Sequence, residues 1–104
     1  MSNFLSKKLL SLNLNRKSEG MSLANYKPFI IFEKLIFISG QLPFEKNELK
    51  YTGKIDTNLS DEEAKESVFL STNNLLWNLN DAINGLEINR IKCLNLKGYF
   101  NCSN

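Results

Sequence analysis

The longest regular hydrophobic pattern in the chain lies between residues 61 and 84 and predicts an amphipathic helix. Ser60 and Glu63 form the S-x-x-E pattern of a capping box at its start. Acidic residues fill the first turn, where the positive end of the helix dipole favours them. Gly85 stands where a left-handed residue after the last turn is expected. Both ends of this helix are therefore marked in the sequence.

The apolar residues of this predicted helix recur three or four positions apart and so share one face. The face comprises Ala64, Val68, Leu75, Leu79 and Ala82, with Leu76 and Ile83 beside them. Phe69 and Trp77 lie away from its centre, which predicts that they cover a sheet edge or belong to an oligomer contact. The acidic residues at 61–66 are interpreted as a solvated helix start rather than a metal site.

Shorter apolar runs before this helix predict strands. Residues 28–32 and 35–39 are rich in Phe and Ile and flank a polar pair at 33–34, which indicates a β-hairpin. Residues 45–48 are all polar and predict a loop. Residues 49–55 follow as a third short strand.

The last part of the chain, residues 88–102, also has a strand-like composition. A strand after the helix is consistent with a crossover onto the same sheet, with the helix covering one face. We therefore expect the hairpin 28–39, the helix 61–84 and a strand at 90–101 to form one α+β layer.

The first nineteen residues form a separate segment, and residues 20–104 form the main domain. Leu5, Leu9 and Leu12 share a helical face, and the segment is basic before Glu19. We interpret it as a short helix packed on the domain surface. A mitochondrial presequence is the alternative. No apolar run approaches the roughly 18–20 residues of a membrane-spanning helix, so no membrane association is expected.

The composition of the chain excludes several classes of catalytic and binding site. With 104 residues the chain is one domain at most, and a net charge of +2 argues against nucleic-acid binding through phosphate contacts. The chain has no histidine, which excludes Ser–His–Asp and Cys–His catalysis. Cys93 and Cys102 do not form a CxxC pair, and we interpret them as reduced packing residues of a cytoplasmic protein. A functional role for Cys102 is the alternative.

The segment Ser39-Gly40-Gln41-Leu42-Pro43 follows directly on an apolar strand. Glycine lets a ligand approach the backbone closely, and proline ends the strand. A small hydroxyl residue beside glycine at a strand end can form a shelf for a ligand. The simpler interpretation is an ordinary exit from a strand into a loop.

Several motifs in a fixed order resemble the RidA (YjgF, endoribonuclease L-PSP-like) family. They are Asn25-Tyr26, Phe37 to Pro43, Leu59 to Ala64, Asn73 to Leu76, Leu86 to Ile91, and Lys97 to Cys102. The resemblance covers about residues 20–104 and keeps its order throughout. The ordered combination is more specific than any one of these motifs.

The resemblance implies a chorismate-mutase-like α+β fold that assembles as a homotrimer, with ligand pockets at subunit interfaces. It also implies hydrolysis of reactive enamine and imine intermediates to 2-oxo acids and ammonia, without a metal or organic cofactor. Some members of the family carry an endoribonuclease label. Carried over by motif, Tyr26, Ser39 and Gly40 would line the pocket for a small carboxylate-bearing imine.

The chain departs from the family pattern after residue 102. The family continues with a second helix and further strands, which carry an arginine for the substrate carboxylate and a glutamate for water activation. Arg16 and Arg90 do not match that arginine. We therefore expect a sheet that lacks its last strands and an impaired activity. A non-catalytic ligand-binding or regulatory trimer subunit and a non-functional truncated product are the alternatives.

Overall fold

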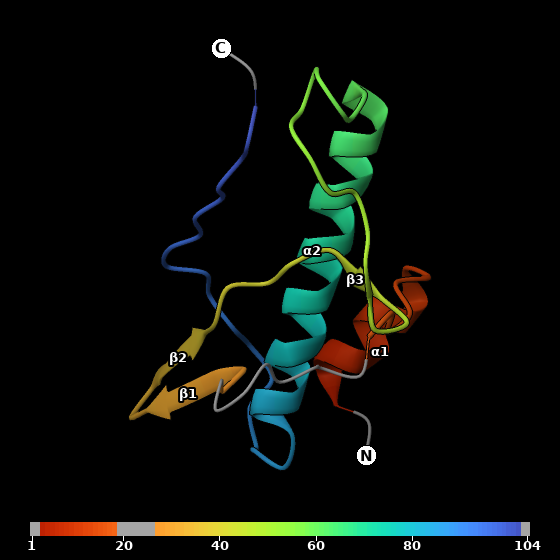
Figure 1. Cartoon of the computed structure of the whole chain (residues 1–104). Coiled ribbons are helices and arrows are strands. Elements are labelled where there is room, and N and C mark those ends of the chain that lie inside the picture. The colour runs from red at the N-terminus through yellow and green to blue at the C-terminus, as the bar shows by residue number, and fades with distance from the viewer. Residues whose placement is uncertain (1–2, 19–26, 103–104) are drawn as a thin grey trace.

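A long central helix, α2, organises the computed structural model of this chain (Figure 1), which describes residues 3–18 and 27–102. The elements in chain order are α1 (Phe4–Ser11), β1 (Phe29–Phe32), β2 (Leu35–Ile38), β3 (Phe44–Glu45), β4 (Glu48–Leu49) and α2 (Asp61–Ile83). Each of α1, β1, β2 and β3 contacts α2. The result is a small α+β arrangement with short antiparallel strands, as the hydrophobic pattern predicted in outline.

Both predicted ends of α2 are confirmed. The Glu63 backbone N–H donates to Ser60 Oγ at 3.1 Å, and the Ser60 backbone N–H donates to Glu63 Oε1 at 3.0 Å. These reciprocal bonds satisfy two backbone donors that the first turn leaves unpaired. Gly85 has φ of 85°, a left-handed conformation that costs glycine little.

The predicted apolar face of α2 is only partly right. Val68, predicted to lie on this face, is 42% exposed, whereas Trp77, predicted to lie away from its centre, is 8% exposed. Asparagine side chains share the buried face, because α2 packs against loops whose carbonyl groups need donors. The buried apolar core is correspondingly small and consists of Leu9, Leu70, Trp77, Ala82 and Ile83.

The predicted hairpin is confirmed as β1 and β2. They pair antiparallel with Phe29 opposite Ile38 and Phe32 opposite Leu35, in a two-stranded sheet. Glu33 turns the chain with φ of 54°, a left-handed conformation that is uncommon for residues other than glycine. The hairpin projects beside the C-terminal half of α2 (Figure 1).

The predicted loop at 45–48 needs correction, because Glu45 and Glu48 belong to the short strands β3 (Phe44–Glu45) and β4 (Glu48–Leu49), and only residues 46–47 form the turn between them. Phe44 pairs with Leu49 across this turn, and Lys46 and Asn47 both have positive φ, of 51° and 64°. Positive φ at both central residues is the condition for a type I′ hairpin turn. The predicted strand at 49–55 shrinks to Leu49 at one end and an isolated bridge at Ile55.

The predicted strand at 90–101 is wrong as a sheet element. In the described part of the chain no residue from 86 to 101 belongs to a strand, although the segment runs extended past α2 (Figure 1). Its end is held where the Ile55 N–H donates to the Asn101 carbonyl at 2.9 Å. A strand forms only beside a partner with free backbone groups, and this segment pairs with neither edge of the hairpin. The crossover onto one sheet is therefore not formed.

The predicted packing role of the cysteines is also wrong, because Cys93 and Cys102 are free and exposed. They lie on the same extended segment, which has no second layer against it. Burial of these thiols would require a covering element, and none is provided by the described residues.

The N-terminal helix is confirmed but is shorter than the segment 1–19. Asn3 caps α1 by accepting from the backbone N–H groups of Leu5 and Ser6. Leu9 is buried and α1 contacts α2, as expected for a helix on the domain surface, whereas Leu12 is exposed. The presequence alternative stays a prediction. Neither described helix is long and apolar enough to cross a membrane.

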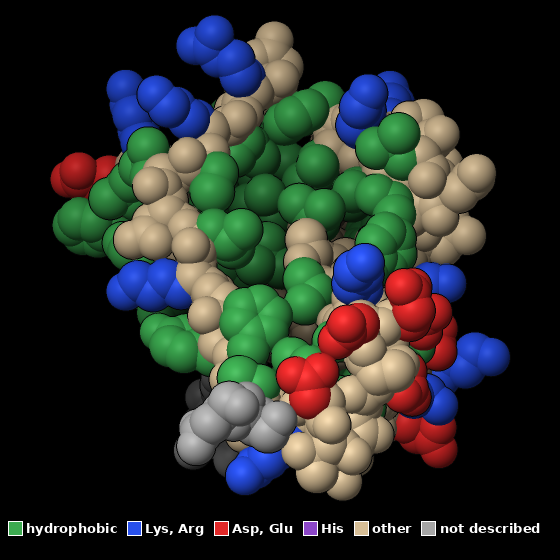
Figure 2. Space-filling model, turned by 90° about the horizontal axis from the view of Figure 1, so that it is seen from above, with side chains coloured by type: hydrophobic (Ala, Val, Ile, Leu, Met, Phe, Trp, Pro, Cys, Tyr) green, Lys and Arg blue, Asp and Glu red, His purple; other side chains and the backbone are tan. Residues whose placement is uncertain are grey.

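The chain exposes more surface than a compact protein of its size. Its accessible surface is 8130 Å² and its mass 11.9 kDa, for which a compact monomer would expose about 5,900 Å². The radius of gyration is 14.8 Å, against about 13 Å for a compact domain of this length. Figure 2 shows the consequence as a hollowed face on which hydrophobic side chains gather.

Candidate functional site: the end of strand β2

Three buried asparagines of α2, Asn73, Asn74 and Asn78, are here called the asparagine row, and the last two hold the segment that follows β2. Asn74 Nδ2 donates to the carbonyl oxygens of Leu42 and Phe44, at 3.2 and 2.9 Å. Asn78 Nδ2 donates to Gln41 Oε1 at 2.8 Å. The buried row thus supplies the donors that a neighbouring strand would supply in a sheet.

Asn73, the first residue of the row, holds a different segment, the loop after α1. Asn73 Nδ2 donates to the Asn15 carbonyl at 2.8 Å, and Trp77 Nε1 donates to the Leu14 carbonyl at 2.8 Å. Successive turns of α2 therefore hold two segments that are far apart in the sequence. Sequence reasoning missed these roles. The only available signal was the density of asparagine in a helix, where this residue is a poor helix former.

Ser39 extends the hairpin ladder by one step. Its backbone N–H donates to the Pro28 carbonyl at 2.9 Å, and its hydroxyl group donates to the Lys27 carbonyl. The hydroxyl proton is therefore engaged within the chain, and the oxygen lone pairs are left to accept. A ligand at this position would meet Ser39 Oγ as a hydrogen-bond acceptor.

Gly40 lies where β2 leaves the sheet, and its backbone does not require glycine. Its φ lies outside the left-handed region, and a Cβ atom built on it would meet no heavy atom of its surroundings within 4 Å. Gly53 differs in both respects, with φ of 116° and a Cβ position 2.5 Å from Asn58 Cβ. The open space over Gly40 is what a close approach of a ligand or another chain needs.

Gln41 connects this shelf to the helix. Its Nε2 donates to the Ser39 carbonyl at 3.0 Å, while its Oε1 accepts from Asn78. The amide side chain thus bridges the backbone at the end of β2 and the asparagine row. Of the three predicted site residues, Ser39 and Gly40 are adjacent on this shelf, and Tyr26 lies outside the described residues.

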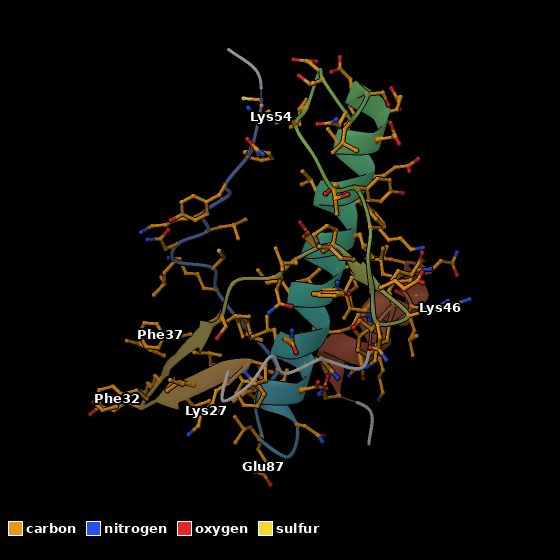
Figure 3. All side chains as sticks on the ribbon, in the orientation of Figure 1. Lys27, Phe32, Phe37, Lys46, Lys54 and Glu87 are labelled. Carbon is orange, nitrogen blue, oxygen red and sulfur yellow. The ribbon has the colours of Figure 1, made fainter. Side chains whose placement is uncertain are left out.

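Among the described residues, no hydrogen bond or ion pair joins Arg16 or Arg90 to this shelf. Arg16 forms a bidentate ion pair with Asp81, at 2.6 and 3.1 Å, and its guanidinium lies 4.9 Å from the centroid of the Trp77 ring. Arg90 is exposed on the extended segment after α2. Lys27, whose carbonyl accepts from Ser39, is near the base of the hairpin (Figure 3). Within residues 3–18 and 27–102, no group of three Cys, Asp or Glu side chains could hold a metal ion.

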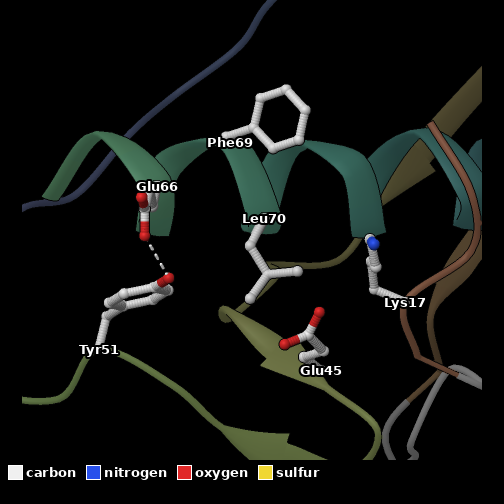
Figure 4. A pocket seen from close by; sticks show the side chains of 6 residues that line it. All are labelled: Lys17, Glu45, Tyr51, Glu66, Phe69 and Leu70. Carbon is white, nitrogen blue, oxygen red and sulfur yellow. Dashed lines mark hydrogen bonds between the residues drawn. The ribbon is translucent and has the colours of Figure 1, made fainter. Parts of the chain in front are cut away.

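A concave region lies toward the other end of α2, beside β3. It is an open cavity of about 190 Å³, and its lining residues are Lys17, Glu45, Tyr51, Glu66, Phe69 and Leu70 (Figure 4). The Tyr51 hydroxyl donates to Glu66 Oε2 at 2.6 Å. This hydrogen bond, with smaller contributions from desolvation and nearby carboxylates, raises the pKa of Tyr51 above its ordinary value.

Together these features define a small α+β domain with a polar shelf at the end of its hairpin. No family model matches the chain, and a search of curated proteins also gave no match. The chain is similar to a solved structure, the protein Atu1372 of Agrobacterium tumefaciens, whose function is unknown. The sequences are 30% identical and the TM-score is 0.59, over 79% of this chain and 48% of the other. The chain therefore spans about half the length of that protein.

Proposed function

We propose that this chain belongs to the RidA-type proteins and contributes part of a pocket for small carboxylate-bearing imines. The ordered motifs from Asn25 to Cys102 support the proposal. The observation that carries it is the shelf at Ser39 and Gly40, which combines an acceptor hydroxyl with open space over a glycine. The finer proposal for the fold is a chorismate-mutase-like sheet, of which the hairpin β1–β2 is one part.

The proposed reaction is the hydrolysis of an enamine or imine to a 2-oxo acid and ammonia, with water as the second reactant. Ser39, Gly40 and Tyr26 would shape the pocket, and none of them carries a positive charge for the substrate carboxylate. Lysine replaces a bidentate arginine poorly, because its ammonium is a single point charge. We therefore propose that the 104-residue chain has weak or no imine deaminase activity by itself.

Activity is tested by generating 2-aminoacrylate enzymatically and following pyruvate release with and without the chain. Loss of a charge-assisted hydrogen bond weakens binding roughly ten- to a hundredfold. Acceleration equal to that of an active RidA-type enzyme would contradict the proposed impairment. Lys27→Ala and Lys97→Ala would then show whether a lysine replaces the arginine.

A non-catalytic binding role is the second candidate, because in the described part of the chain no hydrogen bond or ion pair joins an arginine to the shelf. Gly40→Leu tests both candidates, since a Cβ atom at this position meets no heavy atom of its surroundings within 4 Å. We expect the variant to keep the helical circular dichroism and to lose binding of 2-oxobutanoate, with Asn95→Leu as the control of equal size. Unchanged binding in Gly40→Leu would show that the shelf takes part in neither function.

We also propose that the chain self-associates, with the homotrimer of RidA-type proteins as the expected form. The large exposed apolar surface supports this, since such patches rarely persist on monomers. Light scattering at micromolar concentration is the test. A stable, well-folded monomer would contradict the proposal. The proposed partners are further copies and a small metabolite, with no role for nucleic acid or membrane. A cytoplasmic location is proposed with them.

A further inference from the structure

The cavity beside β3 has a charge pattern that the proposed imine chemistry does not use. Three separate segments meet there: the loop after α1 with Lys17, the hairpin β3–β4 with Glu45, and α2 with Glu66. A backbone bond from Lys46 N–H to the Lys17 carbonyl, at 2.8 Å, ties the first two together. None of the residues that line this cavity belongs to the shelf at Ser39 and Gly40.

The charged groups are arranged around an apolar centre. Figure 4 shows Leu70 between two ends, with Tyr51 and Glu66 at one end and Lys17 and Glu45 at the other. Among the described residues, neither the Lys17 ammonium nor the Glu45 carboxylate forms an ion pair. The cavity therefore presents one cation, Lys17, and two carboxylates, Glu45 and Glu66, to a ligand.

The Tyr51 hydroxyl group fixes the orientation of the Glu66 carboxylate by a hydrogen bond. The hydroxyl group donates to Oε2, so that oxygen is held in place and Oε1 is left to accept. Tyr51 itself has φ of 56°, an uncommon conformation for an aromatic residue, which brings its ring back toward α2. A carboxylate held in this way loses less rotational freedom when it binds an ammonium group.

We propose that this cavity binds a small α-amino acid with a short apolar side chain, in its zwitterionic form. The Glu66 carboxylate accepts from the ligand ammonium at one end, the Lys17 ammonium donates to the ligand carboxylate from the other, and Leu70 and Phe69 contact the side chain. The cavity volume of about 190 Å³ is below the roughly 300–1,000 Å³ of sites for drug-sized ligands, which fits a ligand of this size.

The test is a titration of the full chain with L-valine, followed by amide chemical shifts of residues 45–51 and 66–70. Isobutylamine, which is valine without its carboxylate, and 3-methylbutanoate, which is valine without its amine, are the matched probes. We expect valine to bind about tenfold or more tightly than either probe, because each lacks one charge-assisted contact. Absence of saturable shifts, or equal binding of valine and isobutylamine, would overturn the proposal.

Two variants locate the contacts. Glu66→Gln keeps an acceptor for the Tyr51 hydroxyl but removes the charge, and Lys17→Met removes the cation. Both side chains are exposed, so the fold should survive. Each variant should weaken valine binding about tenfold, whereas Glu87→Gln, which removes an exposed carboxylate after α2, should leave it unchanged. Unaltered binding in Glu66→Gln would overturn the proposed site. Neither result affects the imine proposal, which concerns different residues.

Discussion

The two sides of α2 are stabilised in different ways. On the loop side, the segments around residues 14–16 and 41–45 are hydrogen bonded to the helix by the asparagine row and Trp77. On the strand side, the hairpin β1–β2 and the segment 86–102 expose most of their large apolar side chains. The difference shows that side-chain hydrogen bonds hold the loops against α2 on one side, whereas the hairpin and the segment 86–102 leave an uncovered apolar surface on the other.

The largest expected effect is on the loop side, in Trp77→Ala. The substitution removes the largest buried side chain of the small core, together with the bond from Nε1 to the Leu14 carbonyl. We expect the free energy of unfolding to fall by about 3–5 kcal/mol, as measured by denaturant titration. Phe69→Ala, which truncates an aromatic side chain that is 59% exposed, is the control and should cost far less. Equal losses in the two variants would contradict the assignment of Trp77 to the core.

This residue also shows where sequence reasoning fails. The positions of α2 and of the hairpin could be predicted, because capping residues and apolar runs act locally. The face of α2 could not, because hydrophobic periodicity assumes an apolar partner and α2 packs instead on loop carbonyls. Trp77 is buried there since its N–H can reach a carbonyl, which periodicity does not consider.

The asparagine row should give the next largest effect. Asn74→Ala leaves the carbonyl oxygens of Leu42 and Phe44 without the donor that holds them in this structure. We expect a loss of about 1–3 kcal/mol in the free energy of unfolding, the cost of unsatisfied buried polar groups. Asn95→Ala, at an exposed asparagine of the segment 86–102, is the matched control. If both variants unfold at the same denaturant concentration, the row does not stabilise the loop side.

The shelf itself was predicted in part. Ser39 and Gly40 could be found because a small polar pair at a strand end is visible in the sequence. The donation from Ser39 Oγ to the Lys27 carbonyl and the bridge through Gln41 could not, since both depend on how the hairpin and α2 meet. The predicted strand at 90–101 was wrong for a related reason: strand-like composition gives no information on whether a partner edge lies beside it.

On the strand side we expect a small effect on stability and a clear effect on association. Leu94→Ser with Leu96→Ser replaces two side chains that are 72% and 69% exposed. The free energy of unfolding of the monomer should change by less than about 0.5 kcal/mol per site. Self-association, measured by sedimentation, should decrease. A strongly destabilised monomer would mean that these leucines are buried in the folded chain.

The smallest expected effect is on the pKa of Tyr51, whose hydroxyl group is hydrogen bonded to Glu66 of α2. The bond to Glu66 raises the pKa of Tyr51, so Glu66→Gln should move that pKa back toward its ordinary value. A raised pKa favours the protonated phenol in the folded chain, so the associated stability is present below the unfolded pKa and is lost as pH rises through the folded pKa. Tyrosinate absorbance during an alkaline titration measures the change. An unchanged titration curve would show that the Glu66 carboxylate does not raise the pKa of Tyr51.

Residue-resolved amide hydrogen exchange of the monomer tests the contrast between the two sides most directly. The account predicts strong protection in the central turns of α2, residues 70–80, and at Phe44, whose neighbours are held by the asparagine row. It predicts exchange close to the rate of an unstructured chain for residues 91–100, which belong to no strand. Protection of residues 91–100 comparable to that of α2 would contradict the account, because it would require a sheet partner for this segment.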